Sequence, residues 1–499
     1  MKERLHPVMF AGTGSDVGKS IIATAFCRIF RQDGYTPAPF KAQNMALNSF
    51  ATPDGREIGR AQAVQAEAAG IPCHTDMNPL LLKPQSDHTS QVVLNGKPIG
   101  NRDAYDYFRK EGREELREAV HAAYDRLAAR HNPIVMEGAG SLAEINLRDS
   151  DLVNVPMAMH AGADIILVGD IDRGGVFASV YGSVMLLRPE ERKYVKGILI
   201  NKFRGDLRLF EEGRRMLEEL CGIPVLGVVP YYHDIHIEEE DSVALAAKSA
   251  AAQRGKINVA VVLLRHISNF TDFNVLEQDP RVHLFYSNNV EELAKADILI
   301  LPGSKSTLDD LYEIRRNGVA QAILRARREG ATVLGICGGY QMMGQQIRDP
   351  HHVEGTIEAM PGLGLLPMVT EMLPEKVTRQ VHFTLADSPD SQPMEGYEIH
   401  MGETCPTSDN PVSPLNLLED GQMDGCFVDA KCMGSYIHGI LDNPAFIDRL
   451  LEPHSAKLTK TASAFDYHAF KETQYDRLAD HVRKYVNVPL LYDILKGKR

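Results

Sequence analysis

The sequence predicts an α/β protein in which a doubly wound parallel sheet is followed by a second α/β domain. In the first part of the chain, short apolar runs alternate with stretches of helical pattern, as the βα units of a parallel sheet require. A second series of such units starts near Ile257, after a segment that turns acidic and then alanine-rich. At 499 residues, the chain is long enough for two or three domains with a core each. We therefore expect domains at 1–235 and 257–446, a linker at 236–256 and a helical extension at 447–499.

Charge and composition exclude several classes of protein. Lys and Arg total 54 against 67 for Asp and Glu, so a net charge of −13 argues against nucleic acid or a membrane surface as a partner. No run approaches the roughly 18 apolar residues of a membrane span, and the apolar stretch at the N-terminus is too short for a secretory signal. We therefore expect a cytoplasmic protein. The seven cysteines are odd in number, widely spread and without a CxxC pair, which disfavours a disulfide framework and a zinc site.

A phosphate-binding loop is predicted at GTGSDVGKS, between the strand PVMFAG and the helical pattern IIATAFCRIFRQDG. A glycine-rich loop at a helix N-terminus directs several N–H groups to one place, while the lysine adds charge and the serine offers a hydroxyl to magnesium. A loop that only connects strand and helix is the alternative, but it has no need of lysine and serine in this register. We expect this loop to bind ATP through Thr13, Gly14, Ser15, Asp16, Val17, Gly18, Lys19 and Ser20.

Polar residues are also predicted at the carboxyl ends of the neighbouring strands, where an open parallel sheet binds its ligands. Lys41 and Asn44, in FKAQNMALNS, follow the second strand and would meet substrate or the γ-phosphate. Arg173 stands among glycines in DIDRGGVFAS, where a positive charge suits the transition state of phosphoryl transfer. Asn201 ends the strand VKGILIN, a place from which such folds read the nucleotide base. The alternatives are a solvated charge for Lys41 and a loop salt bridge with a neighbouring aspartate for Arg173.

Three residues are candidates for magnesium. Ser20 is the hydroxyl of the phosphate loop, and Glu137 ends the strand NPIVME, which is followed by small residues that leave room for a nucleotide. A carboxylate at a strand end facing the phosphate loop supplies the second metal contact, directly or through water. Glu57 is the weaker candidate, since it equally suits the charge that a helix N-terminus favours.

A nucleophilic cysteine is predicted in the second half, in TVLGICGGYQMM. The run before Cys337 has the pattern of a buried strand, and the glycine pair after it permits a sharp turn into a helix, which exposes the thiol beside backbone N–H groups. Gly303 follows an upstream strand in DILILPGSKST, so its N–H and that of Gly338 are candidates for an oxyanion hole. His438, in GSYIHGI, is the candidate base. A buried structural cysteine is the alternative, but it would need no glycines on its far side.

The strings LPGS, GICGGYQ and YIHG resemble the triad class of glutamine amidotransferases, in which cysteine attacks the side-chain amide of glutamine and releases ammonia. The resemblance implies a flavodoxin-like domain and assigns the catalytic pair to Cys337 and His438. Such domains usually carry glutamate two positions after the histidine, where this sequence has Ile440. The branch that lacks this glutamate is the one attached to corrin-ring amidases.

The first half resembles the dethiobiotin synthetase-like ATPases in its GTxxxVGKS loop, which departs from the common pattern in having Thr13 where a glycine is usual. Taken in order, GTGSDVGKS, FKAQNMALNS, MEGAGS, DIDRGGVFAS, NKFRGD, GICGGYQ and SYIHG resemble the cobyric acid synthase family over nearly the whole chain. That resemblance implies ATP, Mg²⁺ and glutamine as cosubstrates and cofactor. It also implies a corrinoid substrate, adenosylcobyrinic acid a,c-diamide, amidated at its b, d, e and g carboxylates.

Two alternatives to this function remain at the level of sequence. One is a cobyrinic acid a,c-diamide synthase, which has the same architecture, although FKAQNMALNS argues against it. The other is an ATP-dependent switch with an inactive amidotransferase half, which the presence of both Cys337 and His438 argues against.

Overall fold

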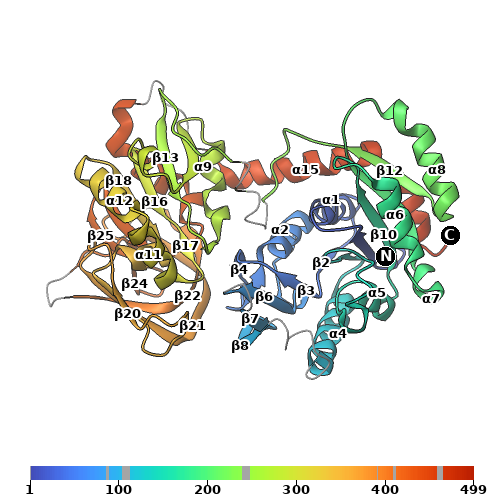
Figure 1. Ribbon diagram of the computed structural model, residues 1–499, viewed down its shortest axis with the longest axis horizontal. Coiled ribbons are helices and arrows are strands. Elements are labelled where there is room, and N and C mark those ends of the chain that lie inside the picture. Colours follow the sequence, from blue (N-terminus) through green and yellow to red (C-terminus); the bar gives the residue numbers. More distant parts are fainter. Residues whose placement is uncertain are drawn as a thin grey trace. The chain divides into compact units, whose positions relative to one another are not determined.

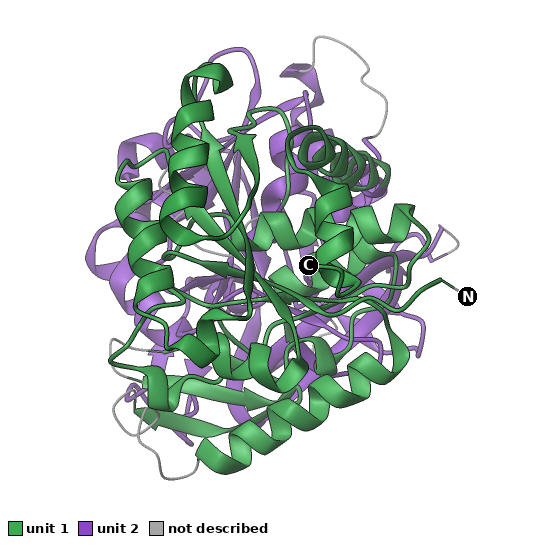
Figure 2. Ribbon diagram, turned by 90° about the vertical axis from the view of Figure 1, so that its right-hand side faces the viewer, with its two compact units in different colours: residues 1–45, 58–237, 469–499 green, residues 46–57, 238–468 purple. Residues whose placement is uncertain are grey.

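The computed structural model divides the chain into two compact units, which are coloured in Figure 2. Unit 1 comprises residues 1–45, 58–237 and 469–499, and unit 2 comprises residues 46–57 and 238–468. The residues described are 2–85, 89–103, 113–238, 245, 248–389, 392–407, 412–457 and 465–499. The expected linker at 236–256 therefore falls partly outside the described residues.

Unit 1 is built on a parallel sheet in the order β12-β11-β10-β1-β9-β2. Chain order reverses on either side of β1, so this is the doubly wound sheet that the sequence predicts. Its interior strands are buried along their length because helices cover both faces. The strands are β1 (Val8–Gly12), β2 (Ala38–Phe40), β9 (Ile134–Glu137), β10 (Asp164–Asp170), β11 (Val195–Phe203) and β12 (Val225–Pro230).

A smaller sheet in unit 1 has the order β3-β6-β7-β8, in which β6, β7 and β8 pair in antiparallel fashion. Its strands are β3 (Gln43–Met45), β6 (Leu80–Pro84), β7 (Thr89–Leu94) and β8 (Lys97–Asp103). The helices of unit 1 are α1 (Lys19–Gln32), α2 (Arg60–Ala69), α4 (Arg113–Arg130), α5 (Val155–Ala161), α6 (Val176–Met185), α7 (Pro189–Arg192), α8 (Glu211–Cys221), α15 (Tyr467–Tyr485) and α16 (Val488–Leu495).

The last two helices complete the core of unit 1. Helix α15, red in Figure 1, lies beside α1, and Leu478 and Val482 share a buried apolar cluster with residues of α1 and β1. Arg28 on α1 is buried and donates to Asp476 on α15 at 2.7 Å. The C-terminal end of the chain is therefore part of the same body as the N-terminal sheet.

Unit 2 contains a sheet in the order β15-β13-β16-β18-β26-β25, which is parallel except for the edge strand β25. When the five parallel strands are numbered by their order along the chain, their spatial order is 2-1-3-4-5, which is the flavodoxin-like arrangement. The strands are β13 (Ile257–Val262), β15 (Val282–Ser287), β16 (Ile298–Leu301), β18 (Thr332–Ile336), β25 (Cys426–Asp429) and β26 (Cys432–Ser435). The predicted fold class is thus confirmed in both halves of the chain.

A second sheet in unit 2 is dominated by the long antiparallel pair β21 (Met368–Leu385) and β22 (Met394–Pro406). Its other strands are β19 (Gln346–Arg348), β20 (Ala359–Pro361), β23 (Asn416–Leu418) and β24 (Met423–Asp424). Two short strand pairs lie outside the larger sheets: β4 (Ser49–Ala51) pairs with β5 (Glu57–Gly59), and β14 (Ile267–Ser268) pairs with β17 (Gly303–Ser304). The helices are α9 (Asn274–Gln278), α10 (Val290–Leu293), α11 (Thr307–Arg316), α12 (Val319–Arg328), α13 (Gly338–Met343) and α14 (Pro444–Leu451), with a 3₁₀ turn, η5, at Phe270–Phe273.

Candidate active sites

The predicted elbow at Cys337 is present in unit 2. Cys337 lies between β18 and α13 with φ 51° and ψ −111°, a strained conformation for a residue with a side chain. The turn requires glycine at position 339, because a Cβ there would lie 1.9 Å from the carbonyl oxygen of Leu301. This close approach to the neighbouring strand explains the glycine pair, and it presents the thiol at the carboxyl edge of the sheet.

His438 and Asp272 form a buried pair in the same site. His438 Nδ1 lies 2.7 Å from Asp272 Oδ2, and the N–H of Gly439 donates to the other carboxylate oxygen at 3.2 Å. Both side chains are less than 5% exposed. A carboxylate that fixes one ring nitrogen leaves the other nitrogen for the nucleophile, so this pair completes a Cys–His–Asp arrangement.

The protonation of His438 follows from these neighbours. Burial by itself would lower the pKa of His438, but the Asp272 carboxylate and then Cys337 act against it and raise the pKa to about 10. His438 is therefore protonated at neutral pH, held between an acceptor on one side and the cysteine on the other. Such a group can donate a proton to a departing nitrogen.

The two glycines predicted for the oxyanion hole are also brought to this site. A Cβ on Gly303 would lie 3.3 Å from Cε1 of His438, and one on Gly338 would lie 2.8 Å from the backbone nitrogen of Ser304. The loop after β16 and the elbow are therefore in direct contact beside His438. Their function as oxyanion donors stays a prediction.

Asp272 is the functional residue that the motifs did not identify. It lies in η5, within the loop that follows β13, whereas the usual acid of this enzyme class would stand at the position of Ile440. Ile440 is fully buried at the start of a 3₁₀ turn and has no carboxylate to offer His438. The carboxylate that contacts His438 comes from another loop, at Asp272. The signal in the sequence was an acid in ISNFTDFN, a loop at the same edge of the sheet as Cys337.

The phosphate loop of unit 1 lies between β1 and α1, as predicted. Lys19 Nζ donates to the carbonyl of Gly14 at 2.8 Å and to that of Gly140 at 3.1 Å. Gly18 has φ 95°, and a Cβ there would lie 2.2 Å from Nδ2 of Asn201, so this position requires glycine. The structure thus brings the predicted loop residues Thr13 to Ser20 into one turn around the amine of Lys19.

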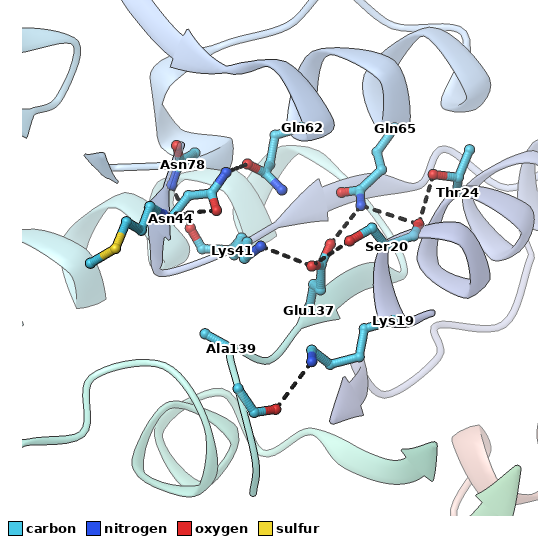
Figure 3. A network of polar contacts seen from close by, with 12 residues as sticks. Lys19, Ser20, Thr24, Lys41, Asn44, Gln62, Gln65, Asn78, Glu137 and Ala139 are labelled. Carbon is cyan, nitrogen blue, oxygen red and sulfur yellow. Dashed lines mark hydrogen bonds and ion pairs between the residues drawn. The ribbon is translucent and has the colours of Figure 1, made fainter. Parts of the chain in front are cut away.

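Glu137 is the centre of a buried polar cluster next to this loop (Figure 3). Its Oε1 accepts hydrogen bonds from Ser20 Oγ and Lys41 Nζ, both at 2.9 Å, and its Oε2 accepts one from Gln65 Nε2 at 2.8 Å. Burial alone would raise the pKa of Glu137, but Lys41 and then the hydrogen bonds from Gln65 and Ser20 lower it below its usual range. Burial lowers the pKa of Lys19 to about 8, although Glu137 opposes this change.

These residues fit a magnesium nucleotide. Ser20 and Glu137 offer a hydroxyl and an ionised carboxylate side by side, which is the donor set that Mg²⁺ takes in phosphate-loop enzymes while keeping several waters. Gly12 provides the close turn, because a Cβ there would lie 2.8 Å from the carbonyl oxygen of Gly14. Among the described residues, no group of three or more His, Cys, Asp or Glu side chains is placed to hold a metal ion by itself.

The remaining predicted residues lie in different surroundings. Asn44 is buried and donates to Gln62 at 3.1 Å. Asn201 donates to the carbonyl of Val17 at 2.9 Å, so Asn201 holds the backbone of the phosphate loop. Arg173 is 74% exposed and lies 4.0 Å from Asp16. Glu57 belongs to unit 2, where its carboxylate accepts from Ser49 Oγ at 2.7 Å and pairs with Lys376. Their roles toward substrate, base and metal stay predictions.

A pocket of about 270 Å³ lies beside the phosphate loop in unit 1 and includes Gly140, which accepts from Lys19. Its wall combines apolar side chains with two arginines, Arg113 and Arg148, and three acids, Glu144, Asp151 and Glu191. Ile145 and Leu147 lie in the loop that follows β9 and contains Gly140, and they are 53% and 38% exposed. The pocket therefore offers apolar surface and charged side chains of both signs next to the nucleotide loop.

Comparison with known proteins assigns both halves of the chain. Residues 8–243 match the CobQ/CobB/MinD/ParA nucleotide binding domain, and residues 258–446 match the CobB/CobQ-like glutamine amidotransferase domain. A cobyric acid synthase of Bacteroides fragilis is 76% identical over 495 residues, which covers 99% of each chain. Those of Phocaeicola vulgatus and Parabacteroides distasonis are 72% and 59% identical over 497 and 498 residues, covering 100% of each chain.

The described part of the chain contains no helix long and apolar enough to cross a membrane. The relatives match from end to end, so the two domains occur in them in the same order and at the same spacing as here. Together with the two domain matches, this similarity shows that the chain belongs to the cobyric acid synthase family.

Proposed function

We propose that this enzyme uses ATP and glutamine to amidate the b, d, e and g carboxylates of adenosylcobyrinic acid a,c-diamide, giving adenosylcobyric acid in cobalamin biosynthesis. The observation that carries the proposal is the buried Cys337, His438 and Asp272 arrangement in a chain that also has a phosphate loop. A chain with both sites can release ammonia and activate a carboxylate to receive it. Membership in the cobyric acid synthase family supports the corrinoid as the acceptor. The cytoplasm is its proposed location.

In unit 2, the thiolate of Cys337 would attack the side-chain carbonyl carbon of glutamine, with the N–H groups of Gly303 and Gly338 stabilising the oxyanion. Protonated His438 would give its proton to the amide nitrogen, which leaves as ammonia and leaves a thioester. His438 would then take a proton from water, whose oxygen attacks the thioester and releases glutamate. Asp272 keeps the ring of His438 in the orientation that these transfers need.

In unit 1, a corrinoid carboxylate would take the γ-phosphoryl group of ATP, giving ADP and an acyl phosphate. Ammonia then attacks the acyl carbon, and phosphate leaves with the electron pair of the broken C–O bond. Magnesium, when bound at Ser20 and Glu137, would neutralise charge on the phosphates. Lys19 and Lys41 would do the same from the loop and from the residue after β2, and Arg173 and Asn44 are proposed to contact the phosphate or the substrate.

The pocket beside the phosphate loop supports a substrate of this kind. A corrinoid has a broad apolar ring edge with carboxylate and amide side chains, and the pocket presents apolar residues together with two arginines and three acids that can bind such polar groups. A single carboxylate arm, not the whole ring, matches its volume of about 270 Å³. The ring itself would then rest on the exposed apolar residues of the neighbouring loop, Ile145 and Leu147.

The test is mass spectrometry of adenosylcobyrinic acid a,c-diamide after incubation with enzyme, Mg-ATP and glutamine, beside Cys337→Ala with either glutamine or ammonia. We expect four new amides with the unmodified enzyme, none for Cys337→Ala with glutamine, and four again for Cys337→Ala with ammonia. ATP hydrolysis without amide formation would contradict the corrinoid assignment. Amidation of cobyrinic acid at its a and c positions would support the a,c-diamide synthase, which the full-length similarity does not favour.

A further inference from the structure

A short segment from the N-terminal part of the sequence is built into the glutamine-cleaving unit. Residues 46–57, here called the inserted segment, are part of unit 2, although the residues on both sides belong to unit 1. Two of its polar residues are deeply buried, with Asn48 1% and Ser49 0% exposed. Buried polar groups are retained where their hydrogen bonds fix a particular geometry, so their partners indicate what the segment does.

The first contact of the inserted segment is with η5, the turn that carries Asp272. The backbone N–H of Ser49 donates to Asn269 Oδ1 at 2.9 Å. Asn48 Oδ1 accepts from the backbone N–H of Phe270 at 3.2 Å. Asn269 has φ 52°, a left-handed conformation that needs support from its surroundings. The inserted segment therefore fixes the start of the turn whose Asp272 orients the catalytic histidine.

The second contact is with the strand beside His438 and Cys337. The ring of Phe50 lies 4.6 Å from that of Tyr397, and the Tyr397 ring stacks on His438 at 5.3 Å with 23° between the planes. Tyr397 and His438 also exchange backbone hydrogen bonds of 3.0 and 2.8 Å. Phe50 also packs against the buried cluster of Ala51, Tyr397 and Ile399, and the carbonyl of Ile399 accepts from Cys337 Sγ at 3.5 Å. Each member of the catalytic set thus has a neighbour that contacts the inserted segment.

The two ends of the inserted segment continue into the nucleotide-binding elements of unit 1. Before it come Lys41 and Asn44, and after it begins α2, which carries Gln62 and Gln65. Lys41 and Gln65 both donate to the carboxylate of Glu137. Asn44 and Gln62 are joined by a hydrogen bond of 3.1 Å, which ties the two ends together. Glu137 and its partners are therefore linked, through hydrogen bonds and the chain itself, to both ends of the inserted segment.

We propose that the inserted segment couples the two active sites: ligands at the phosphate loop set the position of Asn48 and Phe50, and these position Asp272 and His438 for glutamine cleavage. Asn48 and Phe50 are positioning residues, since they act through η5 and Tyr397. The inference rests on the proposed function for the identity of the ligands, Mg-ATP and the corrinoid. It predicts that glutamine is cleaved fastest when the ammonia acceptor is in place.

The experiment measures glutamate release by the full-length enzyme with and without Mg-ATP and adenosylcobyrinic acid a,c-diamide. Asn48→Leu removes the acceptor for Phe270, and Phe50→Ala removes the ring on Tyr397, while Phe50→Tyr keeps that ring. Asp54→Asn, an exposed position of the same segment, is the matched control. Amidation with ammonia in place of glutamine reports on the folding of each variant and on unit 1.

In the unmodified enzyme, we expect the ligands to increase the kcat of glutamine hydrolysis. Asn48→Leu and Phe50→Ala should lower that kcat by about 10- to 100-fold with a nearly unchanged KM, as small misplacement of a catalytic group does. The increase caused by the ligands should be lost in both variants, and Phe50→Tyr and Asp54→Asn should retain it. Ammonia-supported amidation should stay within about twofold of the unmodified enzyme.

Two results would overturn the coupling. One is an unchanged stimulation by ligands in Asn48→Leu and Phe50→Ala, and the other is a loss of ammonia-supported amidation equal to the loss of glutamine hydrolysis. Failure of the proposed function is separable, because then no corrinoid amide forms in any enzyme, while glutamate release with Mg-ATP alone still reports the effect of each variant.

Discussion

The residue that sequence motifs missed gives the sharpest test of the glutamine site. Asp272→Asn keeps the volume of the side chain and removes its charge. In the structure the carboxylate accepts from His438 Nδ1 at 2.7 Å and from the N–H of Gly439 at 3.2 Å. An asparagine can turn its NH₂ toward the ring, and the proton of His438 would then be held on the other nitrogen, the one that should face the thiol.

The size of the effect follows from the burial of the pair. Removing one partner from a buried charged pair costs about 3–5 kcal/mol. Since about 1.4 kcal/mol corresponds to a factor of ten in rate, we expect the kcat of glutamine hydrolysis to fall about 10²- to 10⁴-fold. The KM for glutamine should change little, because Asp272 lies behind His438 and makes its contacts with the ring and with Gly439.

Glutamate release and ammonia-supported amidation are measured on the same preparation. Asp448→Asn is the matched control, because Asp448 pairs with Arg281 in the same unit but is 51% exposed, and it should leave both rates within about twofold. A kcat for Asp272→Asn within threefold of the unmodified enzyme would refute the assignment. An equal loss of ammonia-supported amidation would also refute it, since the damage would then not be confined to glutamine cleavage.

The same variant should change how stability depends on pH. The pKa of His438 in the folded protein is about 10 and its ordinary value is 6.5, so the folded state binds the proton more tightly. The stabilisation from the pair is then fully present below about pH 6.5 and is lost as the pH rises through about 10. The melting temperature of Asp272→Asn should therefore lie below that of the unmodified enzyme near pH 7, and the difference should narrow toward pH 10. A constant difference would contradict this.

Three further predictions concern the phosphate loop and the elbow. Because the pKa of Lys19 is about 8 and phosphate binds its charged form, ATP affinity should weaken about tenfold per pH unit above that pH in equilibrium titrations, and Lys19→Arg should flatten the profile. Lys41→Met leaves the buried charge of Glu137 without its ammonium partner, so amidation should fall at least about 100-fold with glutamine or ammonia while glutamine hydrolysis persists. Gly339→Ala places a methyl group 1.9 Å from the carbonyl oxygen of Leu301, which should cost about 1–3 kcal/mol or more in unfolding experiments and abolish glutamine hydrolysis.

The features that could be predicted from the sequence are local motifs, whose residues lie close together along the chain. The phosphate loop before Lys19 and the elbow at Cys337 are local motifs, in which glycines, charge and the strand-to-helix pattern occur together, and the structure has both. His438 was found because its strand ends in a recognisable string. Glu137 was found because a strand end in a parallel sheet has a known direction relative to the phosphate loop.

The features that could not be predicted are contacts between residues that are far apart in the sequence. Asp272 comes to His438 from a different loop, and no local pattern marks one loop acid among many as the partner of a distant histidine. Glu57 stays a prediction as a magnesium ligand, and no local pattern indicates that its carboxylate meets Lys376, 319 residues away in the sequence. The sequence predicts a helical extension at 447–499, and it does not indicate which core these helices join.

The return of the C-terminal helices to unit 1 has a consequence for how the chain is made. Residues 469–499 follow all of unit 2 in the chain, so translation delivers them after unit 2, and they supply part of the apolar cluster around α1. Unit 2 can therefore finish folding while unit 1 still exposes an apolar face to chaperones and to other nascent chains. A gene split after residue 237 would place the apolar face of unit 1 and the helices that bury it, residues 469–499, on separate chains. A free-standing nucleotide-binding half would require residues 469–499 to be rejoined to residue 237 by a short linker, with a second linker in place of residues 46–57.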